Sequence, residues 1–297
     1  MRYFRNKSVF TDRSGYLFIL PFYALFVYFL LIPIGEVIYY SFTDFNLFSE
    51  RKLVGFHNFN LLLEDQVFLK AMRNTGVYFL FTLIPTMALG LLAAVLLNTT
   101  LFRTSWARAL VFMPHIVSMV SVSMVWMWLY DPTYGLFNRV LSSLGFDTMH
   151  WLIDPKTAMP SVIVMSIWKG IGYNMIIFLA GLQGIPKDYY EAAEVDGASK
   201  IKQFLHITVP LLAPATFFLF VTGVINSFNV FEQINVMTSG GPVNSTTTMV
   251  HQIYLRAFTE FKMGYASAQS VTLLCGVVLI TILNYRFGGS RKKYGED

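Results

Sequence analysis

One polar stretch between two long apolar segments decides how the chain is interpreted: Ile185-Pro-Lys-Asp-Tyr-Tyr-Glu-Ala-Ala-Glu-Val-Asp-Gly197-Ala-Ser-Lys-Ile-Lys-Gln-Phe-Leu-His-Ile207-Thr-Val-Pro210. Pro186 suits the first turn of a helix, and Asp188 places a negative charge where the helix dipole favours one. Gly197 suits the left-handed residue that closes a helix, so we predict a helix of about ten residues. A turn and a second helix, leading into the next apolar segment, should follow.

The predicted helix carries a small, smooth surface. Ala192 and Ala193 permit close approach by another surface, and Glu191 and Glu194 add carboxylates that accept hydrogen bonds. An amphipathic connector with no partner is the alternative for such a loop taken alone. The rest of the sequence has to distinguish a partner-binding helix from such a connector.

The composition on both sides of the loop is that of a membrane protein. Of the 297 residues, 55% are hydrophobic and 13% are charged, against roughly 25% charged in a soluble domain. So few charges do not cover a soluble surface. The single cysteine, Cys275, lies in an apolar run and excludes an intramolecular disulfide or a cysteine metal cluster.

Six segments are apolar enough to cross a bilayer, for which a helix needs about 20 such residues. We therefore predict an all-α membrane protein with six transmembrane helices and the short polar helix between spans four and five. The membrane domain is 14–287 with its loop at 186–210, and the tails are 1–13 and 288–297. The predicted spans are 14–35, 74–102, 109–130, 157–186, 203–231 and 263–285.

Charge and aromatic residues predict the orientation. Lys and Arg are more frequent in one set of flanks than in the intervening loops, which predicts that both termini are cytoplasmic. Tyr and Trp near span ends predict an aromatic belt at the membrane interface. The positively charged flanks are 1–13, 103–108, 183–210 and 286–297, and the predicted belt residues are Tyr39, Tyr40, Trp126, Trp128, Tyr130 and Trp151.

Several kinds of chemistry have no motif in this chain. The sequence contains no G-x-x-x-x-G-K-[ST], H-E-x-x-H or G-x-S-x-G, so it predicts no ATPase and no enzyme of those classes. Carriers driven by ions usually keep ionisable groups deep in their spans. Here Lys169, with Glu36 and Glu232 near span ends, makes no convincing coupling-ion site. Energy is therefore expected from a partner.

The polar loop resembles the EAA signature of permeases in bacterial ABC importers. That signature is Glu-Ala-Ala, three residues, Gly, nine residues, Ile, one residue, then an aliphatic residue and Pro. This chain has Glu191-Ala192-Ala193, Gly197, Ile207 and Pro210, with Val209 where Leu is usual. Further stretches resemble the carbohydrate-uptake branch, and together they run from about residue 16 to 287: Phe102-Arg103 with Leu110–Pro114, Asp131–Asn138, Thr238–Pro242 with Thr246–Thr248, and Gly264–Ala268.

This resemblance implies a bacterial inner-membrane permease whose coupling helix docks into a groove on a separate ATPase. The implied partners are a second homologous permease, two ATP-binding subunits, an extracytoplasmic solute-binding protein and membrane lipid, with no nucleic acid. The chain itself is expected to bind no cofactor, and ATP and Mg are used by the ATPase. The implied coupling residues are Glu191, Ala192, Ala193, Gly197, Ile207 and Pro210.

The same resemblance implies a solute path on spans four and five. Aromatic rings stack on sugar faces while amides and hydroxyls bind sugar edges, although such residues also join helices to one another. Lys169 lines a cavity, pairs with an anionic solute or reaches the interface; the sequence leaves all three open. The implied path residues are Trp168, Lys169, Gly170, Tyr173, Asn174, Asn226, Ser227 and Asn229.

A sugar or oligosaccharide is the predicted solute, with a glycerol-phosphate ester as the alternative because a cation suits a phosphate. A self-sufficient secondary carrier or channel is a different class, opposed by the EAA spacing and the missing coupling charges. A membrane-embedded enzyme is opposed by the lack of a nucleophile–base or metal constellation. Gly240-Gly241-Pro242 either shapes an outer surface for the binding protein or forms an ordinary turn.

Overall fold

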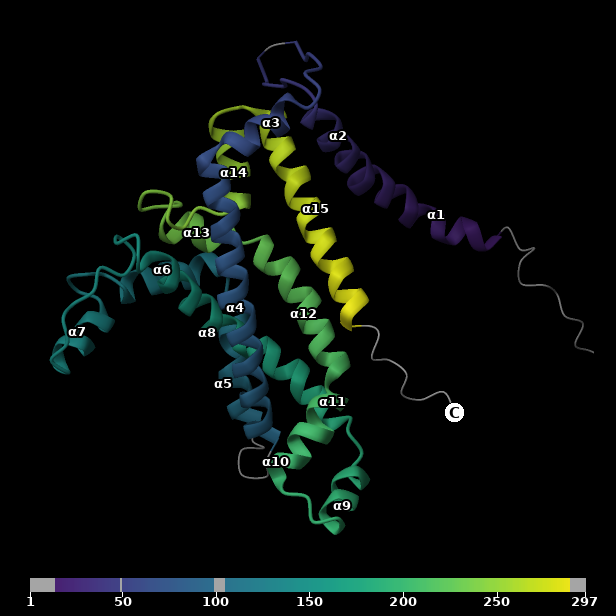
Figure 1. The fold of residues 1–297 in the computed structure, drawn as a ribbon, viewed down its shortest axis with the longest axis vertical. Coiled ribbons are helices and arrows are strands. Elements are labelled where there is room, and N and C mark those ends of the chain that lie inside the picture. The colour runs from purple at the N-terminus through teal and green to yellow at the C-terminus, as the bar shows by residue number, and fades with distance from the viewer. Residues whose placement is uncertain (1–13, 49, 99–104, 289–297) are drawn as a thin grey trace, which may run out of the picture.

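The computed structural model describes residues 14–48, 50–98 and 105–288, and this part of the chain is helical with connecting loops (Figure 1). The predicted all-α class is confirmed. Three predicted features lie outside the described residues: the tail 1–13, the Phe102-Arg103 motif, and residues 289–297 of the C-terminal tail.

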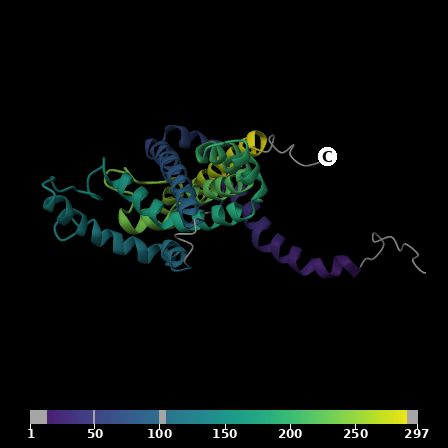
Figure 2. The same cartoon turned by 90° about the horizontal axis from the view of Figure 1, so that it is seen from below.

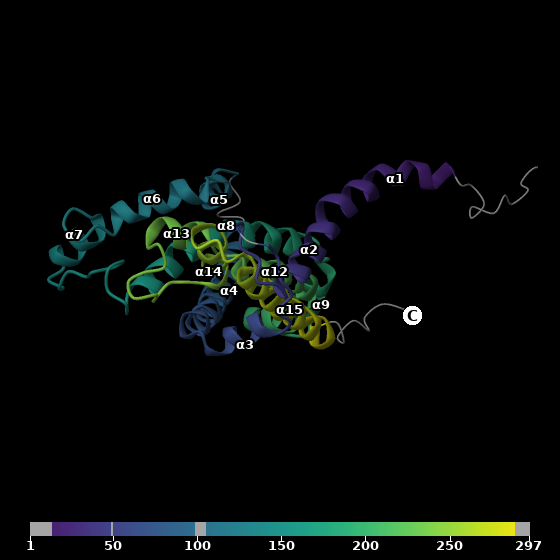
Figure 3. The same cartoon turned by 90° about the horizontal axis from the view of Figure 1, so that it is seen from above.

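The first apolar segment forms a nearly continuous rod. It consists of α1 (Ser14–Phe26), the π-helical turn η2 (Val27–Leu31) and α2 (Ile32–Ser41), so it is longer than predicted. Helix α1 points away from the other helices (Figures 1 and 3), whereas α2 packs against α15 (Met263–Gly288). The most apolar stretch of the rod buries no residue within the chain. So large an apolar surface requires cover from outside the chain.

The centre of the molecule is a bundle of long helices. It contains α4 (Gln66–Asn98), α8 (Ala158–Gln183), α12 (Ala213–Phe228) and α15 (Met263–Gly288). Helix α4 runs along α8 and packs with α8 and α12 around a buried apolar cluster, as expected where helices offer complementary faces. The cluster comprises Ala94, Leu97, Met175, Phe178, Leu179, Leu182, Leu212 and Leu219.

Two of the predicted spans are bent. Span three consists of α5 (Ser105–Ile116) and α6 (Met119–Leu129), which meet at 97°. The helices from 200 to 211 meet α12 at 61°. Within the described residues, four helices are long and apolar enough to cross a membrane, or up to six if each bent pair is one span.

The bend in span three changes the role of two predicted belt residues. Trp126 and Tyr130 are only 8% and 3% exposed and pack with Trp151 in a core cluster that includes residues of α8 and α13 (Glu232–Met237). The Tyr130 hydroxyl donates to the carbonyl of Ser161 at 3.0 Å. These two side chains therefore pack inside the protein, because α6 lies against α13, and they do not form an interfacial belt.

The remaining short elements lie toward the ends of the bundle. Figure 1 places α9 (Asp188–Val195) at one end of the long axis and α3 (His57–Glu64) near the other, with α6 and α7 (Leu136–Ser143) forming an arm at one side. Figure 2 shows the same arm and the first helix extending in opposite directions. The other elements are α10 (Lys200–Gln203), η4 (Phe204–Thr208), α11 (Val209–Leu211), α14 (Met249–Tyr254) and η5 (Leu255–Thr259).

Candidate functional sites

The helix predicted from the polar loop is present as α9. It begins at Asp188. The carbonyl of the preceding residue, Lys187, accepts backbone hydrogen bonds from Tyr190 and Glu191. Pro186 lies before this cap, so its predicted place in the first turn is wrong, and the helix has eight residues rather than ten. The first turn carries Asp188, as expected at the positive end of a helix dipole.

Gly197 closes this helix in the predicted left-handed conformation, with φ at +74°. The Gly197 N–H donates to the carbonyl of Glu194 at 3.0 Å, and the Ala198 N–H donates to the carbonyl of Ala193 at 2.8 Å. This pair of bonds is the Schellman motif, which satisfies carbonyls that the helix leaves open. The turn that follows therefore depends on a residue tolerating a positive φ.

One side of α9 faces away from the protein. None of its residues is buried, and Glu191, Ala192 and Val195 are exposed, with Val195 at 89%. Ala193 is half-buried on the inner side. An exposed row with a valine, a small alanine and a carboxylate offers both apolar area and a hydrogen-bond acceptor to a partner.

The inner side of α9 is tied to the helix that follows. The hydroxyls of Tyr190 and Thr208 are 2.9 Å apart, and Thr208 in η4 is 5% exposed. The Ser199 hydroxyl accepts from the Lys202 N–H and caps α10. Nothing in the sequence pattern identified this link. Ile207 is half-buried in η4 and Pro210 is exposed in α11, so both belong to the bent connection toward α12.

A salt bridge joins the two sides of the turn after α9. The Lys200 ammonium donates to the carboxylate of Glu194. This hydrogen bond, together with the positive charge of Lys200, lowers the pKa of Glu194. Both side chains are exposed, and exposed pairs contribute little to stability. The salt bridge therefore acts mainly on the geometry of the turn between α9 and α10.

The predicted path residues of α8 divide into accessible and committed side chains. Trp168 is 42% exposed and its ring lies 5.5 Å from that of Trp126. Tyr173 is half-buried. Gly170 lies against Thr86, because an added Cβ would be 2.8 Å from the Thr86 Cγ2. Asn174 is 8% exposed and its amide donates to the Gly170 carbonyl at 3.0 Å. Packing within the protein therefore explains the presence of Gly170 and Asn174.

Lys169 is the most constrained residue of this set. Its side chain is 8% exposed. The ammonium donates to the carbonyls of Pro114 at 3.0 Å, His115 at 3.1 Å and Val117 at 2.6 Å. Those carbonyls lie at the break between α5 and α6. Three roles were left open for this lysine in the sequence analysis, and hydrogen bonds to the end of a broken helix were not among them.

The path residues of α12 lie together at its C-terminal end. Asn226 and Asn229 are exposed, whereas Ser227 is 6% exposed. Phe228 packs its ring 5.5 Å from that of Phe79 on α4. The two asparagines are therefore free to meet a ligand or another chain, and Ser227 belongs to the interior.

A buried polar contact in the bundle was missed by the sequence analysis. The Gln233 amide donates to the Tyr78 hydroxyl at 2.8 Å, and these side chains are 5% and 4% exposed. It joins α4 to α13, which are distant in sequence. The partners of a buried polar group are hard to infer from sequence, because burial demands a partner without indicating which.

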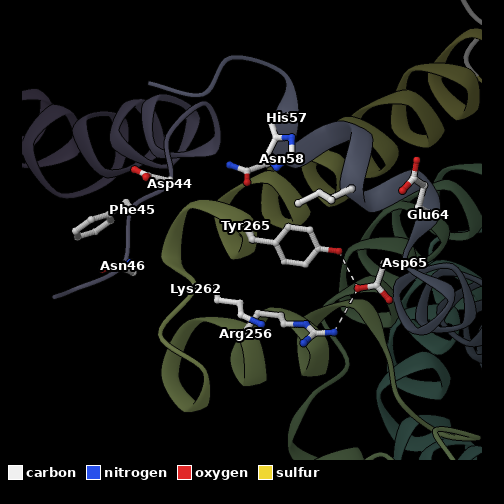
Figure 4. Close-up of a pocket in the computed structure, with 11 residues that line it drawn as sticks. Asp44, Phe45, Asn46, His57, Asn58, Glu64, Asp65, Arg256, Lys262 and Tyr265 are labelled. Atoms are coloured by element: carbon white, nitrogen blue, oxygen red, sulfur yellow. Dashed lines mark hydrogen bonds and ion pairs between the residues drawn. The ribbon is translucent and has the colours of Figure 1, made fainter. Parts of the chain in front are cut away.

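A cavity of about 570 Å³ opens at the end of the molecule that holds α3 (Figure 4). Asp65 accepts hydrogen bonds from the Tyr265 hydroxyl at 2.8 Å and from Arg256 at 3.3 Å. Burial raises the pKa of Asp65, but these bonds, with those from the backbone of Phe68 and Val67, bring it below its ordinary value. The lining residues are Asp44, Phe45, Asn46, His57, Asn58, Leu61, Glu64, Asp65, Arg256, Lys262 and Tyr265.

The loop containing Gly240-Gly241-Pro242 is held by buried polar contacts. The hydroxyls of Thr238 and Thr246 are 2.7 Å apart, and Thr247 lies 3.1 Å from His251, which is 2% exposed. Gly240 has φ at +81°, and an added Cβ would be 2.7 Å from the His251 ring. These buried hydrogen bonds hold the loop in one conformation.

Among the described residues, no group of three or more His, Cys, Asp or Glu is placed to hold a metal ion.

Comparisons with known proteins agree over most of the chain. A family described as binding-protein-dependent transport system inner membrane component matches residues 75–292. The chain is 34% identical over 292 residues to the sn-glycerol-3-phosphate transport system permease protein UgpA of Escherichia coli (strain UTI89 / UPEC), covering 97% of this chain and 99% of that protein. It is 35% identical to the probable ABC transporter permease protein YurN of Bacillus subtilis (strain 168), covering 92% and 94%.

A solved structure matches over nearly the same length. It is the crystal structure of a bacterial ABC transporter involved in the import of the acidic polysaccharide alginate. The TM-score is 0.84 at 25% identity, with 95% of this chain and 97% of the matching chain covered. The bent helices and the separate first helix are therefore set within a fold that has been observed in a transporter.

Proposed function

Because this chain belongs to the family of binding-protein-dependent transport system inner membrane components, we propose that it forms half of the solute path of an ATP-driven importer for a sugar or oligosaccharide. It is an ABC importer permease, a transport subunit of the inner membrane, as its relatives are. The partners completing it are a second permease, two ATP-binding subunits and an external solute-binding protein. ATP and Mg act in the ATP-binding subunits.

The exposed side of α9 is the observation that carries the coupling role. None of the residues of this short helix is buried, and Glu191, Ala192 and Val195, the last 89% exposed, form a row that is available for contact with another surface. Glu191, Ala192, Ala193 and Gly197 are the proposed contacts with the ATPase. Ile207 and Pro210 shape the connection that passes the movement of α9 to α12.

The proposed solute path uses the accessible members of the predicted set. Trp168 and Tyr173 of α8 supply aromatic faces, and Asn226 and Asn229 of α12 supply amide groups. Gly170, Asn174 and Ser227 support the path from behind through packing. A second permease would close the other side, since this chain is only half of the proposed channel.

The orientation follows from the coupling role. If α9 meets an ATPase, its end of the bundle is cytoplasmic, and both termini lie on the same side. The end that holds α3, the cavity and the Gly240-Gly241-Pro242 loop then faces outward. That end is where the binding protein would deliver solute.

The solute class is drawn from two relatives. Similarity to a permease named for sn-glycerol 3-phosphate favours a glycerol-phosphate ester. Similarity to a transporter that imports the acidic polysaccharide alginate favours an oligosaccharide. Competition for uptake by sn-glycerol 3-phosphate and by a neutral trisaccharide, tested side by side, separates the two.

Reconstitution tests the transport role. The chain is placed in vesicles alone, and in parallel with its partner permease, ATPase and binding protein. Uptake is expected only in the complete system and only with ATP on the ATPase side. Uptake by the chain alone would instead support a self-sufficient carrier.

Replacement of Tyr173 by Ala tests the path. Uptake by the complete system is expected to fall on the order of tenfold, as when an aromatic contact is removed from a binding site. Assembly should be unchanged. Tyr134→Ala is the matched control, because Tyr134 is 67% exposed and lies outside the bundle. Equal uptake by both variants would remove Tyr173 from the path.

A further inference from the structure

Lys169 satisfies a set of carbonyls that a broken helix leaves open. Helix α5 ends at Ile116 and α6 starts at Met119, at 97° to it. The last carbonyls of a helix have no partner within it. Here the carbonyls of Pro114, His115 and Val117 all accept from the Lys169 ammonium, which offers three N–H donors and has used all of them.

The charge of Lys169 also suits this position. A cation is favoured at the C-terminal end of a helix, where the peptide dipoles leave negative partial charge. A lysine in the middle of an apolar helix is costly unless it is paired or hydrogen-bonded. In the described part of the chain it makes no ion pair within 4.0 Å, so the three carbonyls are its direct hydrogen-bond partners.

The neighbours of Lys169 on α8 hold the same junction. The Tyr173 ring stacks on His115 with centroids 5.0 Å apart, and Trp168 lies against Trp126 of α6. An added Cβ on Gly172 would be 2.4 Å from the Val111 carbonyl, so α8 reaches the α5 backbone only because residue 172 is glycine. Residues 169, 172 and 173 share one helix face.

We propose that Lys169 is a positioning residue of the transport cycle. It fixes the break between α5 and α6 to the middle of α8, so that both halves of the bent span move with α8 as one body. Resting on the proposed function, this links two sites, because α8 ends at Gln183 and α9 begins at Asp188. A displacement of α9 then reaches α6 through α8.

The same contacts argue against direct binding of solute by this lysine. A phosphate or carboxylate would need an N–H donor, and all three are engaged. Trp168 directly precedes Lys169 on α8 and Tyr173 follows it by about one turn, so loss of the bonds from Lys169 to the carbonyls would displace two path residues at once. Lys169 thus acts on the path through them.

Spin-label distances across the break test the proposal without requiring the solute. Labels are attached through Met113→Cys on α5 and Val125→Cys on α6, both exposed positions, in a Cys275→Ser chain assembled with its partners in lipid. With Lys169 present, one narrow distance distribution is expected. In Lys169→Met the distribution should broaden or shift by about one helical turn, ~5 Å.

A control pair separates release of the break from loss of the fold. Leu92→Cys on α4 and Ile176→Cys on α8 are also exposed positions, and their distance should be the same in both backgrounds. Lys169→Arg, which keeps the charge and N–H donors, should restore the α5–α6 distribution in part. This variant also carries the test if Lys169→Met does not assemble.

Three results would overturn the proposal. They are an unchanged α5–α6 distance in Lys169→Met, a shift of both pairs together, and no difference between the Met and Arg variants. An unchanged distance with reduced uptake would assign Lys169 to the solute instead. None of these results bears on whether the complete system needs ATP. A wrong role for Lys169 and a wrong importer function would therefore be distinguishable.

Discussion

The two ends of the molecule are built in opposite ways. At one end, α9 buries none of its residues and exposes Val195 almost fully. At the other, Thr246, Thr247, Thr248 and His251 are almost completely buried and bonded to one another or to neighbouring backbone. Helix α9 is thus closed by its own cap but open to a partner, whereas these four side chains of the opposite end are bonded within the chain.

This difference indicates how each end works. A helix with little packing against its own chain is positioned by a few contacts, so those contacts decide how its movement is passed on. A loop with many buried hydrogen bonds resists deformation, because each broken bond leaves a buried polar group without a partner. We therefore expect changes near α9 to affect coupling, and changes at the outer loop to affect stability.

The largest effect is expected from Gly197→Val. Residue 197 has φ at +74°, and a β-branched residue held in that region costs about 1–3 kcal/mol. Nothing lies within 4 Å of an added Cβ, so the cost comes from the backbone and not from a clash. The Schellman turn should open, and ATP-driven uptake and retention of the ATPase during purification should be lost.

Gly197→Asn is the matched control, because asparagine tolerates the left-handed region. It should keep most of the uptake while adding a side chain at the same place. If Gly197→Val retained full uptake and bound ATPase, the cap of α9 would have no part in coupling. If Asn were as damaging as Val, the added side chain rather than the backbone would be responsible.

A smaller effect is expected from Tyr190→Phe. The change removes only the hydroxyl that lies 2.9 Å from the Thr208 hydroxyl, a contact worth about 1 kcal/mol. Helix α9 should still bind the ATPase but pass its movement on less well. The number of ATP molecules hydrolysed per solute should rise on the order of two- to fivefold, in line with that energy.

Two further variants sharpen this test. Thr208→Val should give a similar effect, and the double variant should be no worse than either single one, since both remove the same bond. Tyr189→Phe is the control, because Tyr189 is 54% exposed. Additive effects of Tyr190→Phe and Thr208→Val would show that the two hydroxyls act separately.

The sequence predicted the local features better than the long-range ones. The closure of α9 at Gly197 follows from glycine's freedom at positive φ, and Asp188 in the first turn follows from the dipole. Both effects act within a few residues. Helix α9 still begins later than expected, because the first bonded carbonyl is that of Lys187 and Pro186 lies outside the helix.

Periodicity and apolar length located the spans but not their bends. Segment 109–130 contains no Asp, Glu, Lys or Arg, yet it breaks between Ile116 and Met119, and Lys169, more than fifty residues later, bonds carbonyls that the break leaves open. No feature inside that segment reveals such a partner. The assignment of Trp126 and Tyr130 to an aromatic belt was wrong for a similar reason, since the residues that bury them lie on α8 and α13, far away in the sequence.

The candidate sites show the same difference between local features, which the sequence predicts, and long-range contacts, which it does not. Accessible residues such as Trp168 and Asn226 stay in the predicted path, whereas the environment of Asn174 and Gly170 is determined by packing against α4. The buried pair Tyr78–Gln233 and the cluster around Asp65 join elements far apart in the chain. Sequence spacing carries no information about such pairs, because tertiary packing selects the partners.

The smallest effect is expected from acidification of the outer loop. Burial lowers the pKa of His251 from its ordinary 6.5, so the unfolded chain binds the proton more readily than the folded loop does. The contribution of the neutral His251 ring to the free energy of unfolding is fully present above pH 6.5. It is lost as the pH falls through 6.5 toward the pKa of the folded state. The groups against the ring, Thr247, Gly240 and Phe231, do not titrate.

Limited proteolysis of the assembled protein at pH 7.5 and pH 5.5 measures this effect. Cleavage within 238–251 should be faster at pH 5.5, and His251→Gln should remove most of the difference by abolishing the titration. His150→Gln, at an exposed histidine, should leave it unchanged. A loop equally resistant at both pH values would mean that the buried contacts tolerate a charged ring, and the contrast between a hydrogen-bonded outer loop and an exposed α9 would weaken.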